Sequence, residues 1–467
     1  MKQITLIAMA VILITSSCRK IEVDGTPNNG GSSSENVILE GRITANRTLS
    51  ANYIYKLRGL VYVTNGAVLT IEPGTKIVGE LGRNGGLIIT RSSKIIADGT
   101  IDKPIVFTSE ASSPTRGDWA GLVILGNAPT NSSFNGTAGL GEIEGGINNS
   151  DGLGLYGTPS TQAQNAADNS GILRYVRIEY AGYAFLPDKE INGLTMGGVG
   201  NQTIIDYVQV AYANDDSFEW FGGTVNCKHL IAYKGLDDDF DTDNGFSGKI
   251  QYAIGFRDSS VADISGSNGF ESDNDAGGSA LTPQTGAIFS NVTLVGPRAT
   301  LSNVGNSNFK RGIHARRNSA ISIFNSIVMG WPTGWLVDAS TGTPTDLNLV
   351  GGTPKAVYAN NIIAGNNTQL NYTVSGSAPT GWALLDFTNY INRVGGGNTL
   401  LSNASDVQLT DPFKYDNTVD FNPAVASPAL TGADFTNAKL TTWFTPTTYV
   451  GACDGTDMWW KTWTYFN

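Results

Sequence analysis

Three short segments decide the fold, because each places an acidic residue directly after a phenylalanine. They read Ser217-Phe218-Glu219-Trp220, Asp239-Phe240-Asp241-Thr242 and Gly269-Phe270-Glu271-Ser272. The phenylalanines lie 22 and then 30 residues apart. Repetition near 22 residues is typical of the coils of a parallel β-helix, in which a longer interval contains a loop inserted at a turn.

The rest of the chain has the same character. Short β-patterned segments are separated by Gly, Asn and Pro turns, as in Val68-Leu69-Thr70-Ile71-Glu72-Pro73-Gly74. We therefore predict an all-β protein whose residues 37–440 form a single-stranded right-handed parallel β-helix, a solenoid with three parallel sheets. Residues 126–170, rich in Gly, Asn and Ser, are predicted to be a long inserted loop. Residues 441–467, rich in Trp, are predicted to be a C-terminal cap that closes the open end, because an uncapped coil exposes a sheet edge.

Coils stacked about 4.8 Å apart would align equivalent residues in ladders. The three phenylalanines are predicted to stack inside the solenoid. A series of asparagines is predicted to bond the backbone at successive corners: Asn291, Asn325 and Asn360. Acidic residues are predicted to form two ladders that face solvent, one of Glu219, Asp241 and Glu271 and the other of Asp243 and Asp273.

The N-terminal segment has the features of an export signal. Residues 1–17 contain Lys2 and an apolar run that is too short to span a bilayer, which predicts a cleaved signal peptide. Thr15-Ser16-Ser17-Cys18 resembles the sequence at which bacterial lipoproteins are cleaved and acylated, although Thr15 replaces the usual aliphatic residue. We expect lipidation of Cys18, with residues 18–36 as anchor and flexible tether; ordinary secretion is the alternative. Whether Cys227 and Cys453 form a disulfide is left open by the sequence.

The acidic residues predict a metal site. The chain has a net charge of −11, which argues against nucleic acid as a partner. Stacked carboxylates repel unless a cation neutralises them, and oxygen-only ligands suit Ca²⁺. The predicted calcium ligands are Asp215, Asp216, Glu219, Asp237, Asp238, Asp239, Asp241, Asp243, Glu271 and Asp273. The alternative is a hydrated acidic face partly paired with Arg257 or Lys234.

A basic cluster and three tryptophans are further candidates. In strand alternation His314 and Arg316 share one face, and together with Arg317 they could bind a ligand anion or pair with the acidic ladder. Three tryptophans in Gly- and Pro-containing segments could stack on sugar rings: Trp331, Trp335 and Trp382. With only two histidines, a histidine-rich zinc site is excluded.

Together with Asn325-Ser326-Ile327-Val328-Met329-Gly330-Trp331, the acidic segments resemble a large family of parallel β-helix surface lipoproteins of Gram-negative envelopes, mostly without assigned activity. The resemblance implies placement at the cell surface in the outer membrane, often in company with TonB-dependent transporters, and it implies no catalytic residue. The broader fold resembles pectate lyases, which use Ca²⁺ and a basic residue to abstract a sugar proton; this analogy concerns the fold alone.

These features predict a non-enzymatic outer-membrane surface lipoprotein, stabilised by Ca²⁺, that binds a polymer such as a polysaccharide or a nutrient, or accompanies a TonB-dependent transporter. The first alternative is a polysaccharide lyase or glycoside hydrolase, with Asp237, Asp239, Asp241 and Asp243 as metal ligands or acid and base and Arg316 or Arg317 binding a uronate. An acidic polysaccharide needs a basic groove, whereas this chain is most acidic where it is most patterned. The second alternative is an adhesin or structural spacer.

Overall fold

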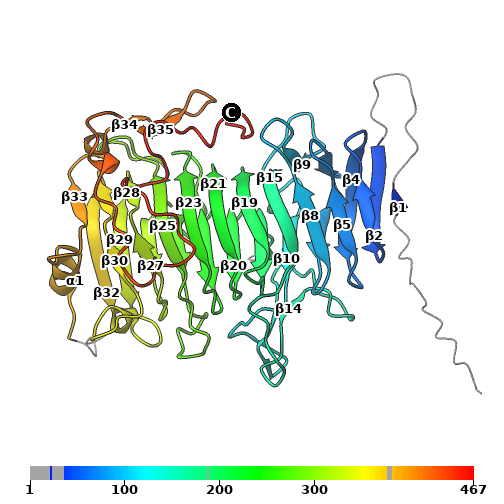
Figure 1. The fold of residues 1–467 in the computed structure, drawn as a ribbon, viewed down its shortest axis with the longest axis horizontal. Coiled ribbons are helices and arrows are strands. Elements are labelled where there is room, and N and C mark those ends of the chain that lie inside the picture. The colour runs from blue at the N-terminus through cyan, green and yellow to red at the C-terminus, as the bar shows by residue number, and fades with distance from the viewer. Residues whose placement is uncertain (1–21, 24–35, 187–188, 376–380, 467) are drawn as a thin grey trace, which may run out of the picture.

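The computed structural model describes residues 22–23, 36–186, 189–375 and 381–466. Within them, 27 strands form one continuous parallel sheet that winds into a long solenoid (Figure 1). The predicted parallel β-helix is therefore confirmed. The predicted signal peptide, Cys18 and most of the predicted tether lie outside the described residues. No helix in the described part of the chain is both long enough and apolar enough to cross a bilayer.

The strands of the solenoid sheet are β1 (Glu22–Val23), β2 (Asn36–Ile43), β3 (Arg47–Leu49), β4 (Ile54–Val63), β5 (Val68–Ile71), β6 (Lys76–Gly79), β7 (Gly86–Ile89), β8 (Lys94–Asp98), β9 (Ile105–Ser109), β10 (Gly121–Leu125), β15 (Gly171–Glu179), β18 (Leu194–Gly197), β19 (Ile204–Ala211), β20 (Phe218–Phe221), β21 (Asn226–Tyr233), β22 (Phe240–Asp243), β23 (Lys249–Phe256), β24 (Asn268–Ser272), β25 (Ile288–Val295), β26 (Arg311–Ala315), β27 (Ser322–Phe324), β28 (Ile327–Met329), β29 (Thr333–Ala339), β30 (Tyr358–Ala359), β31 (Ile362–Ala364), β32 (Thr368–Val374) and β33 (Thr399–Leu401). Four antiparallel hairpins decorate it: β11 (Ser133–Phe134) with β12 (Thr137–Ala138), β13 (Leu140–Glu142) with β14 (Leu155–Gly157), β16 (Ala184–Leu186) with β17 (Lys189–Glu190), and β34 (Leu409–Asp411) with β35 (Asp420–Pro423). The helices are α1 (Leu384–Ile391), η1 (Thr345–Asn348), η2 (Ala404–Val407) and η3 (Pro428–Leu430).

Each coil has three faces although the sheet is continuous, because the longest strands bend in the middle. The bends fall at residues with positive φ that the strand register skips: Tyr175, Tyr207, His229, Tyr252 and Asn291. A left-handed backbone is unfavourable for the three tyrosines, whereas asparagine and histidine adopt it more readily. Stacking of the first four rings along the axis, with centroids 4.5, 4.1 and 4.9 Å apart, compensates for that cost.

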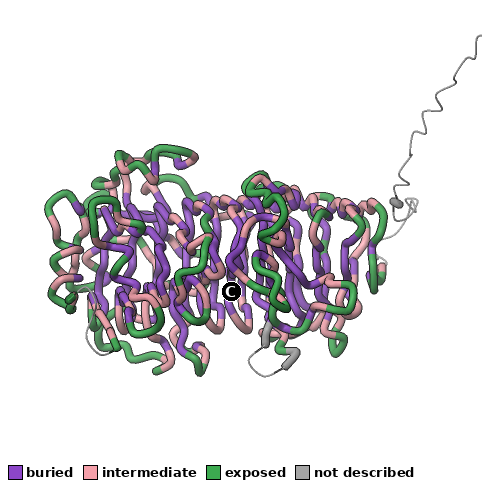
Figure 2. Tube along the Cα trace, turned by 90° about the horizontal axis from the view of Figure 1, so that it is seen from below, coloured by how far each residue is buried: buried purple, intermediate pink, exposed green. Residues whose placement is uncertain are grey.

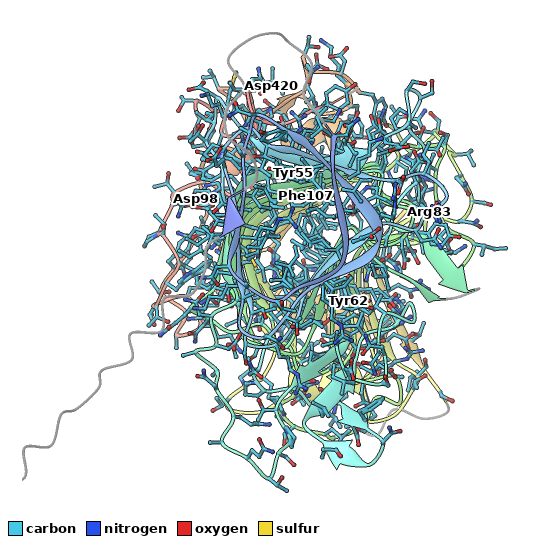
Figure 3. The ribbon with its side chains drawn as sticks, turned by 90° about the vertical axis from the view of Figure 1, so that its right-hand side faces the viewer. Tyr55, Tyr62, Arg83, Asp98, Phe107 and Asp420 are labelled. Carbon is cyan, nitrogen blue, oxygen red and sulfur yellow. The ribbon has the colours of Figure 1, made fainter. Side chains whose placement is uncertain are left out.

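The interior is an apolar core that extends along the whole axis (Figure 2). As predicted, Phe218, Phe240 and Phe270 stack inside, with adjacent ring centroids 5.5 and 5.4 Å apart. In the view along the axis, Tyr55 and Phe107 point into the coil while Asp98 lies outside it (Figure 3). Side chains alternate between the inside and the outside of the coil along each strand, and the outward residues are apolar where the strap or the insertion covers them.

The predicted insertion at residues 126–170 is confirmed, because two hairpins, β11–β12 and β13–β14, replace the coil there. The insertion folds back onto the solenoid, where Tyr156 packs on Phe221. At the C-terminal end of the solenoid, α1 buries Phe387 and Ile391 against the last coils (Figure 1). This helix, which we did not predict, covers the end of the core.

Residues 432–466, here called the C-terminal strap, run back along one face of the solenoid, so the prediction that this region closes the open end is wrong. Side-chain amides hold the strap by its backbone: Gln251 binds both N–H and C=O of Thr445, and Gln209 does the same for Tyr465. The predicted asparagine series also bonds backbone, but the backbone is that of residues 432–449 and not that of the corners.

Candidate functional site

The acidic ladder has the predicted register. Strands β20, β22 and β24 pair so that Glu219 lies beside Asp241, and Asp241 beside Glu271; His314 of β26 follows in the same column. The prediction that the ladder faces open solvent is wrong, since Glu219 is only 5% exposed and its two neighbours are half-buried. Because a buried charge is costly unless it is paired, these carboxylates need a cation or a proton to neutralise them.

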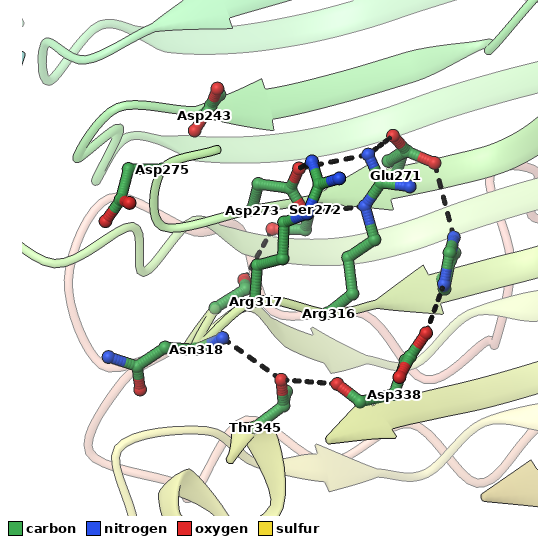
Figure 4. A network of polar contacts seen from close by, with 12 residues as sticks. Asp243, Glu271, Ser272, Asp273, Asp275, Arg316, Arg317, Asn318, Asp338 and Thr345 are labelled. Atoms are coloured by element: carbon green, nitrogen blue, oxygen red, sulfur yellow. Dashed lines mark hydrogen bonds and ion pairs between the residues drawn. The ribbon is translucent and has the colours of Figure 1, made fainter. Parts of the chain in front are cut away.

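One end of the ladder is neutralised by arginine and histidine. Arg316 pairs with Glu271 and forks onto Asp273 with Nε–Oδ1 and Nη2–Oδ2 distances of 2.7 and 3.0 Å (Figure 4). Arg317 also reaches Asp273, at 2.8 Å, and Nδ1 of His314 lies 3.2 Å from Glu271. We call Glu271, Asp273 and these three partners the paired end of the ladder.

The electrostatics of the paired end follow from these contacts. Burial alone would raise the pKa of Glu271, but its hydrogen bond with His314 and the charge of Arg316 lower it below the usual value. Burial opposes the charge of Arg316, yet Glu271 and Asp273 raise its pKa. The pairing of the basic cluster with the acidic ladder, one of the two alternatives for His314, Arg316 and Arg317, is the arrangement observed.

The other end of the ladder has a different environment. Carboxylate oxygens of Asp216, Glu219 and Asp241 all lie within 4.8 Å of one another, and those of Asp215, Asp216 and Asp237 form a second such group. No arginine, lysine or histidine forms an ion pair with Asp216, Glu219 or Asp241 among the described residues. We call these three carboxylates, with Asn192 beside them, the unpaired end.

Burial and mutual repulsion perturb the unpaired end strongly. Burial raises the pKa of Asp216, of Glu219 and of Asp241 well above the usual values, and the neighbouring carboxylates raise them further. The pKa of Asp243 in the same strand rises to about 8, through burial and the charge of Asp273. At neutral pH such carboxylates either take up a proton and become neutral or bind a cation.

Several buried oxygens at this end also lack hydrogen-bond partners in the described part of the chain. They include Oδ1 of Asp241 and Oδ1 of Asn192, a residue that is 1% exposed and whose Nδ2 donates to Glu219. Carboxylate and amide oxygens are hard donors that suit a divalent cation such as Ca²⁺. The unpaired end therefore fits the predicted metal, with Asp216, Glu219 and Asp241 as ligands and Asn192 as a further oxygen.

Asn192 was missed in the sequence because it lies one coil before the acidic repeat. The residues two positions before Leu194, Phe218, Phe240 and Phe270 share one column, because those four residues pair in register. The column is Asn192, Asp216, Asp238 and Asn268. In it, the backbone N–H of Asp238 donates to Asp216 and that of Asn268 to Asp238. Extending the repeat by one coil towards the N-terminus would have found Asn192, whereas Asn268 already lies in the third coil of the repeat.

Two other predicted metal ligands, Asp238 and Asp239, have different partners. Asp239 is fully buried and pairs with the equally buried Arg257, with Oδ1 and Nη1 2.8 Å apart. Asp238 is held by the backbone and side-chain N–H groups of Asn268. Asp239 is therefore enclosed and does not face solvent: Arg257, directly after β23, pairs with it, and the ring of Phe309, in the loop after β25, lies 5.2 Å from the guanidinium.

The predicted sugar-stacking tryptophans are mostly in the core. Trp331 and Trp335 are fully buried, so the prediction that they lie in accessible loops is wrong. Trp382 is half-buried beside Tyr390, with ring centroids 6.1 Å apart. Cys227 and Cys453 are both buried as free thiols, and no disulfide joins them.

A family model of the pectate-lyase-like β-helix domain matches residues 41–399, a range that contains the whole acidic ladder. A search of curated proteins finds no match to the chain. Because the matched range spans most of the sequence, the chain belongs to the family of pectate-lyase-like β-helix domains.

Proposed function

We propose that this protein is a non-enzymatic, calcium-stabilised surface lipoprotein of the outer membrane, whose β-helix presents a binding surface for a polymer, a nutrient or a transporter of the TonB-dependent class. The observation that carries the metal part is the unpaired end: two buried carboxylates and one half-buried carboxylate within 4.8 Å of one another, with no basic partner among the described residues. A Ca²⁺ ion bound there would neutralise the carboxylates and bind only the folded chain.

The non-enzymatic part rests on the paired end. A lyase of this fold class would need a basic residue free to take a sugar proton, and the basic residues at the acidic ladder are His314, Arg316 and Arg317. Both arginines are engaged by Asp273, and Arg316 also by Glu271. The His314 ring lies between Glu271 and Asp338. An arginine held by two carboxylates is a poor proton acceptor, since its pKa rises further.

Calcium binding is tested by thermal unfolding and calorimetry on the full chain. After treatment with EGTA, addition of Ca²⁺ is expected to raise Tm, with a gain of about 2.7 kcal/mol at a hundredfold excess over Kd. Mg²⁺ is expected to be less effective, because its strict octahedral shell fits this irregular set of donors poorly. The double variant Asp216→Asn/Asp241→Asn should lose the Ca²⁺ response.

The matched control is Asp98→Asn, which removes one carboxylate from a half-exposed ion pair with Arg174 and should keep the full response. A Tm that is indifferent to millimolar Ca²⁺ and to EGTA would contradict the metal part and leave the fold untouched.

The lipoprotein part is tested separately. Cys18→Ala is expected to release the protein from the membrane fraction, because acylation of that thiol is the only attachment proposed. If the variant still sediments with membranes after a carbonate wash, a partner protein and not a lipid holds it.

A further inference from the structure

A cleft of about 400 Å³ lies on the outer face of the early coils, on strands that do not carry the acidic ladder. Its floor comes from β6, β9 and β15, and one wall is the end of the C-terminal strap. The side chains that define its chemistry are Lys76, Val106, Arg177, Glu179, Tyr180 and Tyr465. Small-molecule sites in proteins typically have volumes of about 300–1,000 Å³.

The strand register explains why the cleft exists. Lys76, Val106, Arg177, Gln209, Ile231 and Ile254 form one outward column along successive coils. In the later coils Ile231 and Ile254 are buried beneath the strap, where they share an apolar cluster with Trp460 of the strap. At Gln209, which binds Tyr465, the column changes from apolar to charged. The cleft lies on the same outward column that the strap covers in the later coils, but here the column carries the charged residues Lys76 and Arg177. The floor of the cleft therefore suits a polar ligand.

The charge of the cleft is opposite to that of the chain as a whole. Nε of Arg177 donates to Glu179 at 2.9 Å and its Nη1 to the carbonyl of Trp463 at 3.3 Å, so the guanidinium is held in place. Lys76 is exposed and forms no ion pair among the described residues. Two cations against one carboxylate give the lining a net charge of +1, whereas the chain carries −11.

The walls supply flat apolar surfaces beside these cations. The Tyr180 ring is fixed by stacking on Tyr212, with centroids 4.8 Å apart and planes 3° from parallel. The Tyr465 ring lies 5.8 Å from the guanidinium of Arg177, in a cation–π arrangement. Rings held in this way offer contact area at little entropic cost.

We propose that this cleft binds a small organic monoanion, a carboxylate carried on a flat ring. The carboxylate would pair with Lys76 and Arg177 above Val106, and the ring would lie against Tyr180 and Tyr465. This site is independent of the calcium proposal, since none of its lining residues belongs to the acidic ladder.

The test uses benzoate as the probe and benzamide as its uncharged analogue, titrated into the full chain by calorimetry in EGTA. Benzoate is expected to bind once per chain with Kd of about 1 mM, and benzamide about tenfold more weakly. Lys76→Gln should weaken benzoate binding about fivefold or more, and because Lys76 is exposed the variant should fold. Arg177→Gln should weaken it further.

The matched control is Lys94→Gln, which removes a half-exposed lysine of β8 outside the cleft and should leave benzoate binding unchanged. The proposal is overturned if benzoate fails to saturate, if benzamide binds equally well, or if Lys76→Gln has no effect. It is also overturned if binding requires Ca²⁺, since the carboxylate would then be a ligand of a metal at the ladder.

Discussion

The two ends of the acidic ladder differ in what the adjacent coil provides. At the paired end, β26 and the turn after it bring His314, Arg316 and Arg317 against Glu271 and Asp273. At the unpaired end, β18 and the residues before it bring Thr195 and Asn192, which can share hydrogen bonds but carry no charge. Carboxylates in the same register and on the same face thus have pKa values shifted in opposite directions, lowered for Glu271 and raised for Glu219.

The difference shows how a solenoid separates register from function. Stacking fixes where a side chain lies, because coils repeat about every 4.8 Å. Whether a stacked carboxylate is stable depends on its neighbours one coil away. A stacked carboxylate is stabilised as a charged group where the next coil supplies cations, as for Glu271, whose pKa is lowered. Where the next coil supplies only an amide, as for Glu219, repulsion between the carboxylates is not neutralised and the pKa is raised.

The largest expected effect comes from breaking the paired end. Arg316→Met should lower the free energy of unfolding by about 2–4 kcal/mol. The reason is that the largely buried carboxylates of Glu271 and Asp273 would lose one of the cations that neutralise them. The Arg316 side chain is 24% exposed, so the loss should be below that of a fully buried pair. Urea denaturation measures it. Arg298→Gln, which removes a single hydrogen bond with Asn367, is the control and should cost less than about 1 kcal/mol.

The second prediction sets one carboxylate from each end against the other. Glu271→Gln should destabilise the metal-free protein by about 1–3 kcal/mol, because it weakens charge-assisted hydrogen bonds with Arg316 and His314. Asp241→Asn should instead stabilise the metal-free protein by about 0.5–2 kcal/mol, because it removes a charge from a repulsive cluster. Two denaturation curves recorded in EGTA decide the matter, and shifts of the same sign would refute the distinction between the ends.

The sequence was sufficient to predict the position of the ladder residues but not their burial. The repeat of Phe218, Phe240 and Phe270 was enough to predict the coil, the register and the ladder, because register in a stacked solenoid is a local consequence of spacing. Pairing of the ladder with arginine was foreseen as an alternative, since Arg316 follows His314 by two residues and therefore shares its face.

Burial of the ladder could not be predicted, because it depends on segments outside the repeat. The insertion at residues 126–170 folds back to place Tyr156 on Phe221, next to Glu219 in β20, and Asn192 lies 27 residues before Glu219. Loop length and composition do not show where an insertion will pack. The C-terminal strap was misplaced for the same reason: its tryptophans indicated burial but not the face that they cover.

The third prediction concerns pH. In the native state the pKa values of the unpaired end are raised well above their usual values, and those of the nearby Asp237 and Asp243 rise to about 6 and about 8. The native chain therefore binds more protons than the unfolded chain between pH 4 and 8. Stability of the metal-free protein should therefore fall as pH rises through this window. Glu271, whose pKa is lowered, contributes stability that is present above its unfolded pKa and is lost on acidification.

Melting curves in EGTA at pH 5 and pH 8 are expected to give the higher Tm at pH 5. Saturating Ca²⁺ should reverse or flatten the trend, because binding requires deprotonated carboxylates. The variant Glu219→Gln/Asp241→Asn should flatten it without metal. A Tm in EGTA that rises from pH 5 to pH 8 would mean that the charges of the unpaired end are compensated by another route.

The smallest expected effect is that of monovalent salt. Raising KCl from about 0.05 to 0.5 M shortens the Debye length from about 14 to about 4 Å, but buried charges are screened much less than exposed ones. Repulsion at the unpaired end should ease by a few tenths of a kcal/mol, while attraction at the half-exposed edge of Arg316 weakens by a similar amount. In EGTA the wild-type chain should therefore respond little to salt.

Asp241→Asn, which keeps only the attractive part, should be destabilised by salt, and Arg316→Met, which keeps only the repulsive part, should be stabilised. Opposite salt slopes for these two variants, measured by urea denaturation at each KCl concentration, would assign the compensation to the two ends of one ladder; parallel slopes would show that charges elsewhere dominate the response.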